Sequence, residues 1–168
     1  MTEIPPPSAA PEMSRPFPIA RIGDGARFTV EATQAECRAL SIRMGLAEIY
    51  ALTCRFDLRR GESHAIEADG LLHARIRQTC VVSLEPFDAT IAENFTLRFV
   101  PEGRLSETLD IESDDEIAYE GNILELGEAA SEQLALVIDP FPRMPGAELP
   151  GDASVSASPF ATLSKLLQ

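Results

Sequence analysis

The sequence predicts an α+β fold, mainly an antiparallel β meander with two helices packed on it. Three segments between residues 50 and 99 alternate apolar and polar residues, as half-buried strands do. The connections between them are too short for crossovers, so neighbouring strands should run antiparallel. Two further segments repeat apolar residues at helical spacing. These patterns fit either a sheet or a partly open barrel.

The length of 168 residues fits one domain with tails. Residues 1–15 contain four prolines and little apolar content, which predicts a flexible proline-rich arm. A single α+β domain should occupy residues 16–146. Residues 147–168 then form a linker and a C-terminal amphipathic tail, which either packs on its own domain or serves as a docking peptide.

The domain should begin with two short strands, near Phe17–Arg21 and Arg27–Glu31. The glycines of Gly23-Asp24-Gly25, which separate these two segments, suit a hairpin turn. The sequence therefore predicts a β hairpin at the start of the domain.

A helix should follow, because Thr33 and Glu36 form the capping-box pattern that satisfies backbone donors at a helix start. Cys37 and Leu40 continue at helical spacing, and Gly45 offers the left-handed residue that ends a helix. The first helix is thus expected between residues 33 and 45.

The three long strands are read from alternation alone. The first begins at Tyr50, and its predicted core-facing residues are Tyr50, Leu52, Cys54, Phe56 and Leu58. After a turn at residues 61–63, a second strand is expected over residues 72–82, with Cys80 and Val82 on its apolar face. Pro86 should break it, and a third strand should cover residues 89–99.

Shorter elements are expected in the C-terminal part. Ile117–Tyr119 and Asn122–Leu126 predict short β segments, and a second helix should run from about residue 127 to 138. Glu128 and Glu132 would lie near its positive end, which favours carboxylates. Asp139-Pro140 stops the helix, because proline disfavours helical backbone in the residue before it.

Charge limits the class of partner. Lys and Arg number 14 against 27 Asp and Glu, which gives a formal net charge of −13. The negative electric field of a chain with this net charge repels polyphosphates over most of the surface and favours a basic partner. The first residues lack the pattern of a secretory signal, and no apolar run approaches the ~20 residues that span a bilayer. We therefore expect a cytoplasmic protein, with reduced, buried cysteines.

No catalytic motif is found. His64 and His73 are the two histidines, and neither stands beside a nucleophile motif. Cys80 and His73 should point apart, because they fall on opposite faces of one predicted strand. Walker, Rossmann and HExxH patterns do not occur. The sequence thus predicts no enzyme, no cofactor and no metal site.

Residues 102–116 are polar and acidic and predict an exposed loop. This loop is either solvated, or a contact for a basic partner, or a site for Ca²⁺. The calcium interpretation is the weakest, because the spacing differs from that of a calcium-binding loop. Asp114 and Asp115 are candidate contacts for a basic partner.

Positive charge is expected on the polar faces of the strands. Arg75, Arg77 and Arg98 lie on adjacent predicted strands, where Arg55 and Arg59 could extend the patch. They either pair with carboxylates of neighbouring strands or contact phosphate or RNA.

Two stretches resemble a known family. The first is Cys80-Val81-Val82-Ser83-Leu84-Glu85-Pro86-Phe87, and the second begins at Asn122-Ile123-Leu124-Glu125-Leu126-Gly127-Glu128 and continues to Asp139-Pro140-Phe141-Pro142-Arg143. Both are similar to the YceD family of bacterial proteins implicated in accumulation of large-subunit ribosomal RNA. The closing Pro159-Phe160-Ala161-Thr162-Leu163 resembles the tail of its alphaproteobacterial members.

The resemblance implies a role in ribosome biogenesis and an association with the basic large-subunit protein bL32. Many relatives carry a Cys-x-x-Cys pair where this chain has Cys80 and Ser83, and more cysteines where it has residues 139–145. Tetrahedral zinc needs about four such ligands. One cysteine remains here, so a structural core should replace the metal.

Three functional hypotheses follow. The first is a non-enzymatic assembly factor for the large ribosomal subunit that binds a basic ribosomal protein or a precursor particle. Its candidate contacts are Leu84, Glu85, Pro86, Phe87, Asp114, Asp115 and Arg143, although the turn and the helix end could equally be structural. The second is an RNA-binding module that uses Arg75, Arg77 and Arg98. The third is an enzyme of an unfamiliar kind.

Overall fold

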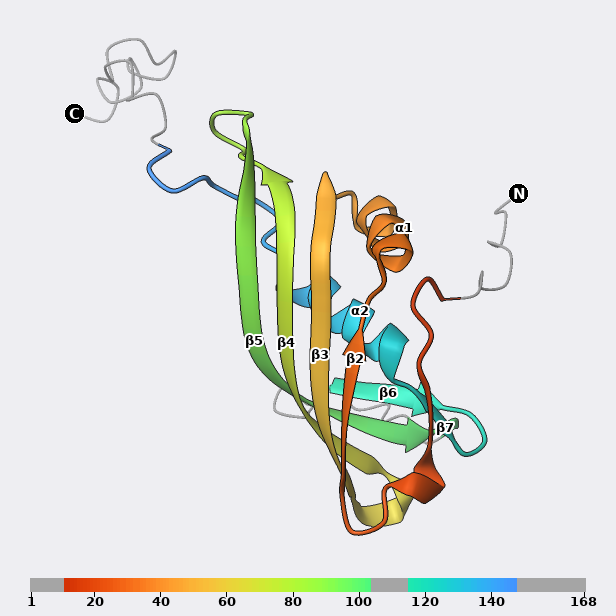
Figure 1. Ribbon diagram of the computed structural model, residues 1–168. Coiled ribbons are helices and arrows are strands. Elements are labelled where there is room, and N and C mark those ends of the chain that lie inside the picture. The colour runs from red at the N-terminus through yellow and green to blue at the C-terminus, as the bar shows by residue number, and fades with distance from the viewer. Residues whose placement is uncertain (1–10, 104–114, 148–168) are drawn as a thin grey trace, which may run out of the picture.

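A five-stranded sheet in the order β2-β3-β4-β5-β6 forms the centre of the computed structural model, which describes residues 11–103 and 115–147 (Figure 1). A second, two-stranded sheet pairs β1 with β7. The elements are β1 (Pro16–Pro18), η1 (Ile19–Arg21), β2 (Ala26–Glu31), α1 (Gln34–Met44), β3 (Glu48–Arg60), η2 (Glu62–His64), β4 (Ile66–Thr79), β5 (Pro86–Pro101), β6 (Asp115–Tyr119), β7 (Ile123–Glu125) and α2 (Leu126–Val137). The α+β class is confirmed.

The predicted antiparallel meander is confirmed for β3, β4 and β5, and β2 adds to β3 in the same sense. The sheet is open, because β2 and β6 form its two edges. The last strand differs in direction from the others: β6 runs parallel to β5, from the pair Leu97 and Asp115 to the pair Pro101 and Tyr119.

The predicted hairpin at the start of the domain is wrong. β1 pairs with β7 and β2 pairs with β3, so the two segments beside Gly23 and Gly25 belong to different sheets. β1 also ends at Pro18, and η1 follows where strand was expected up to Arg21. The physical reason is that prolines at both ends of β1 lack the N–H groups that would extend a ladder.

Helix α1 follows the prediction closely. The Thr33 Oγ1 accepts a hydrogen bond from the Glu36 backbone N–H at 3.3 Å, and Glu36 Oε2 accepts one from the Thr33 N–H at 2.7 Å. Gly45 ends the helix with φ 66°. Arg15 donates to both Glu36 carboxylate oxygens at 2.8 Å, and these bonds lower the Glu36 pKa to about 2.

Three predictions about the long strands are wrong, one on the side that a residue faces and two on where a strand begins or ends. Tyr50 does not face the core, because a bulge between Ile49 and Ala51 shifts the register and moves its ring to the polar side. β4 begins at Ile66, and Cys80 and Val82 lie in the turn after it. β5 begins at Pro86 instead of after it, because the first residue of a strand tolerates a missing N–H.

The sheet has one covered face and one open face. Helix α2 and the small sheet of β1 and β7 pack on the covered face, where the core includes Leu52, Phe56, Leu72 and Phe99. Figure 1 shows α2 crossing behind the strands. We call the opposite, polar side the outer face, and its residues include Arg27, Thr29, Thr53, Arg55, Asp57, Arg59, Glu67, Asp69, His73, Arg75, Arg77, Asp88, Thr90, Thr96, Arg98 and Glu116.

Packing extends into the predicted N-terminal arm. Met13 is fully buried, and Glu12 accepts a hydrogen bond from Arg43 at 2.9 Å. The described end of the arm is thus anchored on the domain, whereas residues 1–10 lie outside the described part. Residues 148–168, which hold most of the predicted linker and tail, also lie outside it. No helix among the described residues has the length and apolar content to cross a bilayer.

Candidate partner-binding surfaces

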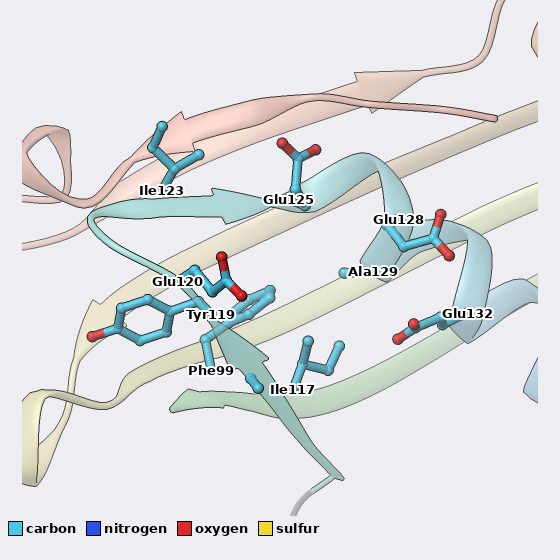
Figure 2. A pocket seen from close by; sticks show the side chains of 10 residues that line it. Phe99, Ile117, Tyr119, Glu120, Ile123, Glu125, Glu128, Ala129 and Glu132 are labelled. Atoms are coloured by element: carbon cyan, nitrogen blue, oxygen red, sulfur yellow. The ribbon is translucent and has the colours of Figure 1, made fainter. Parts of the chain in front are cut away.

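A cleft of about 460 Å³ lies between β6 and α2. Figure 2 shows it framed by β6 on one side and by β7 and the start of α2 on the other. We call it the β6–α2 cleft, and its lining residues are Phe99, Ile117, Ala118, Tyr119, Glu120, Ile123, Glu125, Glu128, Ala129 and Glu132. An apolar floor with four carboxylates around it suits a positively charged ligand that also has apolar parts.

The carboxylates of the cleft are poorly neutralised. Arg43 forms an ion pair with Glu128 at 2.8 Å, but it also forms one with Glu12. The Glu128 Oε2 is buried and accepts no hydrogen bond within the described chain. Burial, and then the charge of Glu128, raises the pKa of Glu132, although Arg43 opposes this shift. The cleft therefore holds negative charge that a cationic group would stabilise.

A close backbone contact fixes the α2 wall of the cleft. A Cβ on Gly127 would lie 2.3 Å from the Met13 carbonyl oxygen, so only glycine allows this approach. Ser131 Oγ donates to the Gly127 carbonyl at 3.0 Å within the helix. Ala130 and Leu134 face the core, which leaves Glu128 and Glu132 on the cleft side one helical turn apart.

The turn between β4 and β5 forms a second, separate candidate surface. Leu84 takes a left-handed conformation with φ 60° and is 76% exposed. The Cys80 N–H donates to the Glu85 carbonyl at 2.9 Å, and the Leu84 N–H donates to the Cys80 carbonyl at 2.9 Å. The turn packs on the segment after α2, because the Val81 N–H donates to the Pro142 carbonyl at 2.9 Å.

Cys80 organises the interior of this turn. Its buried Sγ accepts hydrogen bonds from the N–H groups of Val82 and Ser83, both at 3.4 Å. Hydrogen bonds from Ser83, followed by one from the Met144 backbone, lower the Cys80 pKa to about 7. The other two cysteines are also free and buried, and burial raises the Cys54 pKa to about 12. Among the described residues no three His, Cys, Asp or Glu side chains gather as metal ligands do.

The predicted partner contacts therefore fall at two places. The structure brings Leu84, Glu85, Pro86 and Phe87 to the same end of the molecule as the segment that carries Arg143. Asp115 lies far from them, at the start of β6 beside Leu97, near the opposite end of β5 (Figure 1). Asp114 lies outside the described residues.

The arginines predicted to form one positive patch on the strands lie at two separate places. Arg75 and Arg77 lie over the Tyr50 ring, with guanidinium carbons 4.6 and 5.7 Å from its centroid. Arg77 pairs with Asp88 at 2.8 Å, whereas Arg75 makes no ion pair within the described chain.

Arg98 does not join Arg75 and Arg77. It pairs with Glu116 at 3.4 Å and opposes Glu67 in the sheet, and Glu67 lies eight residues before Arg75 along β4. Such a separation along a strand is about 26 Å. Pairing with carboxylates of neighbouring strands, one of the two predicted roles, describes Arg77 and Arg98.

The histidines are far from Cys80. His73 is exposed on the outer face opposite Thr53 and Ala92, as the alternation predicted, whereas Cys80 is buried in the turn. His64 lies in η2 with φ 67°, and its carbonyl accepts a hydrogen bond from Tyr119 at 2.9 Å.

The helix dipole alone does not predict the cleft. The available signal in the sequence is the pair Glu128 and Glu132, because two glutamates one helical turn apart repel each other and thus favour a nearby cation. The contact between Tyr50 and Arg75 could not be predicted, because a bulge leaves no clear mark in an alternating pattern.

Comparison with known proteins identifies a family. A family model described as "Large ribosomal RNA subunit accumulation protein YceD" matches residues 68–167, which is more than half of the chain. The matched region starts within β4 and extends beyond α2, so it includes every residue that lines the cleft. No curated protein and no solved structure matches the chain.

Proposed function

Because this chain belongs to the YceD family, the large ribosomal RNA subunit accumulation proteins, we propose that it is a non-enzymatic factor in large ribosomal subunit biogenesis. It acts in the cytoplasm by binding a basic ribosomal protein or a precursor particle. The family match over residues 68–167 is the observation that carries this proposal. The basic protein bL32 is the first partner to test.

The charge distribution supports a basic partner. The chain carries a net charge of −13, and the β6–α2 cleft collects four carboxylates, of which Glu128 pairs with Arg43 within the described chain. Complementary charge speeds the encounter of two proteins and fixes their orientation.

The β4–β5 turn supplies a second proposed contact. Leu84 is 76% exposed and Phe141, in the segment that packs on the turn, is 71% exposed. Exposed apolar side chains at a structured turn are typical of protein interfaces. Leu84→Asn keeps the left-handed backbone accessible while removing the apolar side chain, and it should weaken partner capture if this turn is a contact.

Affinity purification of the tagged full-length chain from its own cells tests the function. We expect precursors of the large subunit and basic ribosomal proteins to copurify at low salt, and to be lost progressively as salt screens the charges. Copurification of no large-subunit component above an untagged control would overturn the proposal.

Direct RNA binding is the second candidate, favoured by the stacking of Arg75 on Tyr50, where Arg75 forms no ion pair with another described residue. Aromatic rings and arginines on an open sheet face can bind single-stranded RNA. Replacing Arg75 and Arg77 with alanine should then abolish a gel shift with ribosomal RNA, whereas Arg27→Ala, which removes a paired arginine elsewhere on the same face, should not. A wild-type chain that shifts no RNA removes this candidate.

A further inference from the structure

Exposed apolar side chains gather at the end of the molecule that carries the β4–β5 turn. Six large apolar side chains are exposed in the described structure, and five of them belong to segments that meet at this end, Ile123 being the exception. A gathering of this kind marks a surface that another segment or another protein covers. The five are Ile42, Val81, Leu84, Leu136 and Phe141.

A hollow of about 300 Å³ lies among these segments, where the end of α1, the end of β4 and the segment after α2 meet. We call it the end hollow. In the described structure it shares no lining residue with the β6–α2 cleft. An apolar hollow with exposed apolar side chains around it suits the apolar stripe of a short helix. Its apolar lining consists of Met44, Leu46, Val81, Ile138, Pro140 and Pro142.

The charges beside the end hollow disfavour an acidic occupant. Met44 and Gly45 line it at the C-terminal end of α1, and the C-terminus of a helix carries partial negative charge. The side chain of Asp139 lies in the same lining. In a chain with a net charge of −13, residues 153–168 contain no acidic side chain and hold the single lysine, Lys165. This C-terminal stretch therefore meets the charge requirement that most of the chain does not meet.

The described chain ends beside the end hollow. The Val81 N–H donates to the Pro142 carbonyl at 2.9 Å, and the Ala147 N–H donates to the Met144 carbonyl at 3.0 Å, so the last described residues stay near the β4–β5 turn. Figure 1 shows the described chain ending on this side of the molecule. Residues 148–158 then form a linker whose length corresponds to an average span of about 20 Å. The segment that follows can therefore reach the hollow.

The sequence after this linker has the pattern of a short amphipathic helix. Ser158 followed by Pro159 is a helix-start signature, and Phe160, Leu163 and Leu167 recur on one helical face. An isolated helix shorter than about 12 residues is marginal in water, so its apolar stripe needs a surface that buries it. The family match extends to residue 167 and thus includes this segment.

We propose that residues 159–167 of this chain pack on the end hollow as a short helix and cover the apolar side chains around it. Covalent attachment favours this occupant, because a short linker gives the segment an effective concentration on the order of 1 mM, above that of a second copy or a free protein in dilute solution. The inference is independent of the proposed function, since it concerns only contacts within one chain.

Hydrogen exchange of the full-length chain tests the docking. Amides of residues 160–167 should exchange about tenfold or more slowly than in Phe160→Asp combined with Leu163→Asp, because a carboxylate is costly to bury in an apolar hollow. Ala161→Asp combined with Thr162→Asp is the matched control, since it adds the same charge to the other side of the helix and should keep most of the protection. No protection in the wild-type chain, or equal protection in the two double variants, would overturn the proposal.

A second pair of variants locates the site. Val81→Asp places a charge in the end hollow and should release the protected amides of residues 160–167. Ile123→Asp is its control, because Ile123 is 48% exposed against 44% for Val81 and lines the β6–α2 cleft instead. Slow exchange within β3 reports that each variant stays folded. If Val81→Asp leaves the protection intact, or if both variants remove it equally, the segment does not dock in the end hollow.

Dilution and added partner separate this occupant from others. Protection that arises within one chain is independent of protein concentration, whereas the tail of a second copy would be released on dilution. Loss of protection on dilution, or protection that appears only when a basic ribosomal protein is added, assigns the end hollow to another occupant and refutes the proposal. Neither result affects the proposed function, which is tested by copurification.

Discussion

The outer face of the sheet and the β6–α2 cleft both carry many charged residues, but they arrange them in opposite ways. On the outer face, Arg27 pairs with Asp57 at 2.6 Å and Arg59 with Asp69 at 3.0 Å, so charge is neutralised between neighbouring strands. In the cleft, one of the four glutamates, Glu128, forms an ion pair within the described chain, and its partner Arg43 also pairs with Glu12. The net charge of −13 therefore says little about where a partner binds until the pairing of each carboxylate is known.

The largest effect should come from Gly127→Ala, which would push the α2 wall of the cleft away from the Met13 backbone. Glycine to alanine within a helix normally stabilises by about 1 kcal/mol. Here the added Cβ meets the Met13 backbone, so we expect a loss of roughly 1–3 kcal/mol in the free energy of unfolding. Chemical denaturation measures the sign directly, and a stabilised variant would show that the contact with Met13 is not maintained.

The second largest effect on stability should come from Glu36→Gln, which removes the carboxylate that pairs with Arg15. Its pKa in the folded state is about 2 against 4.5 ordinarily, so its contribution is fully present above pH ~4.5 and is lost as the pH falls toward 2. Because the side chain is 18% exposed, we expect the variant to lose about 1–2 kcal/mol at pH 7. Urea titrations at pH 7 and pH 3 check this, since the difference from wild type should be smaller at pH 3.

In the cleft, Glu132→Gln should instead increase the stability of the folded chain. Burial raises the pKa of Glu132, so its ionised form disfavours folding and protonation relieves the cost as the pH falls through the raised pKa. Removing the repulsion from Glu128 one turn away should stabilise the chain by roughly 0.2–0.5 kcal/mol at pH 7. Thermal melting at pH 7 and pH 4 would show the gain and its decline. A destabilised variant would mean that Glu132 has a partner in the folded chain.

The smallest effect is expected on the outer face. Arg27 and Asp57 are exposed, so solvent screens their ion pair despite its short distance. Asp57→Asn should leave the denaturation midpoint unchanged within error at moderate salt. A clear loss of stability would show that the outer face depends on its ion pairs, and the contrast with the cleft would weaken.

Local signals explain what the sequence could predict. The capping box of Thr33 and Glu36 and the alternation of β3 to β5 involve residues that are near neighbours along the chain, and these elements are found nearly as expected. The pairing of β1 with β7 joins residues more than one hundred positions apart, so no local pattern reports it. The cleft forms only because β6 pairs in parallel with β5. The sequence pattern indicates the loop, strand and helix that line the cleft, but it does not indicate that they lie together.

The pairing of β1 with β7 also sets an order of events during synthesis. Phe17 emerges from the ribosome early but lies opposite Leu124, so β1 has no strand partner until more than one hundred further residues have been made. The antiparallel strands from β2 to β5 need only segments that are already present. The meander can therefore assemble first, and the cleft gains its α2 wall only when most of the chain has left the ribosome.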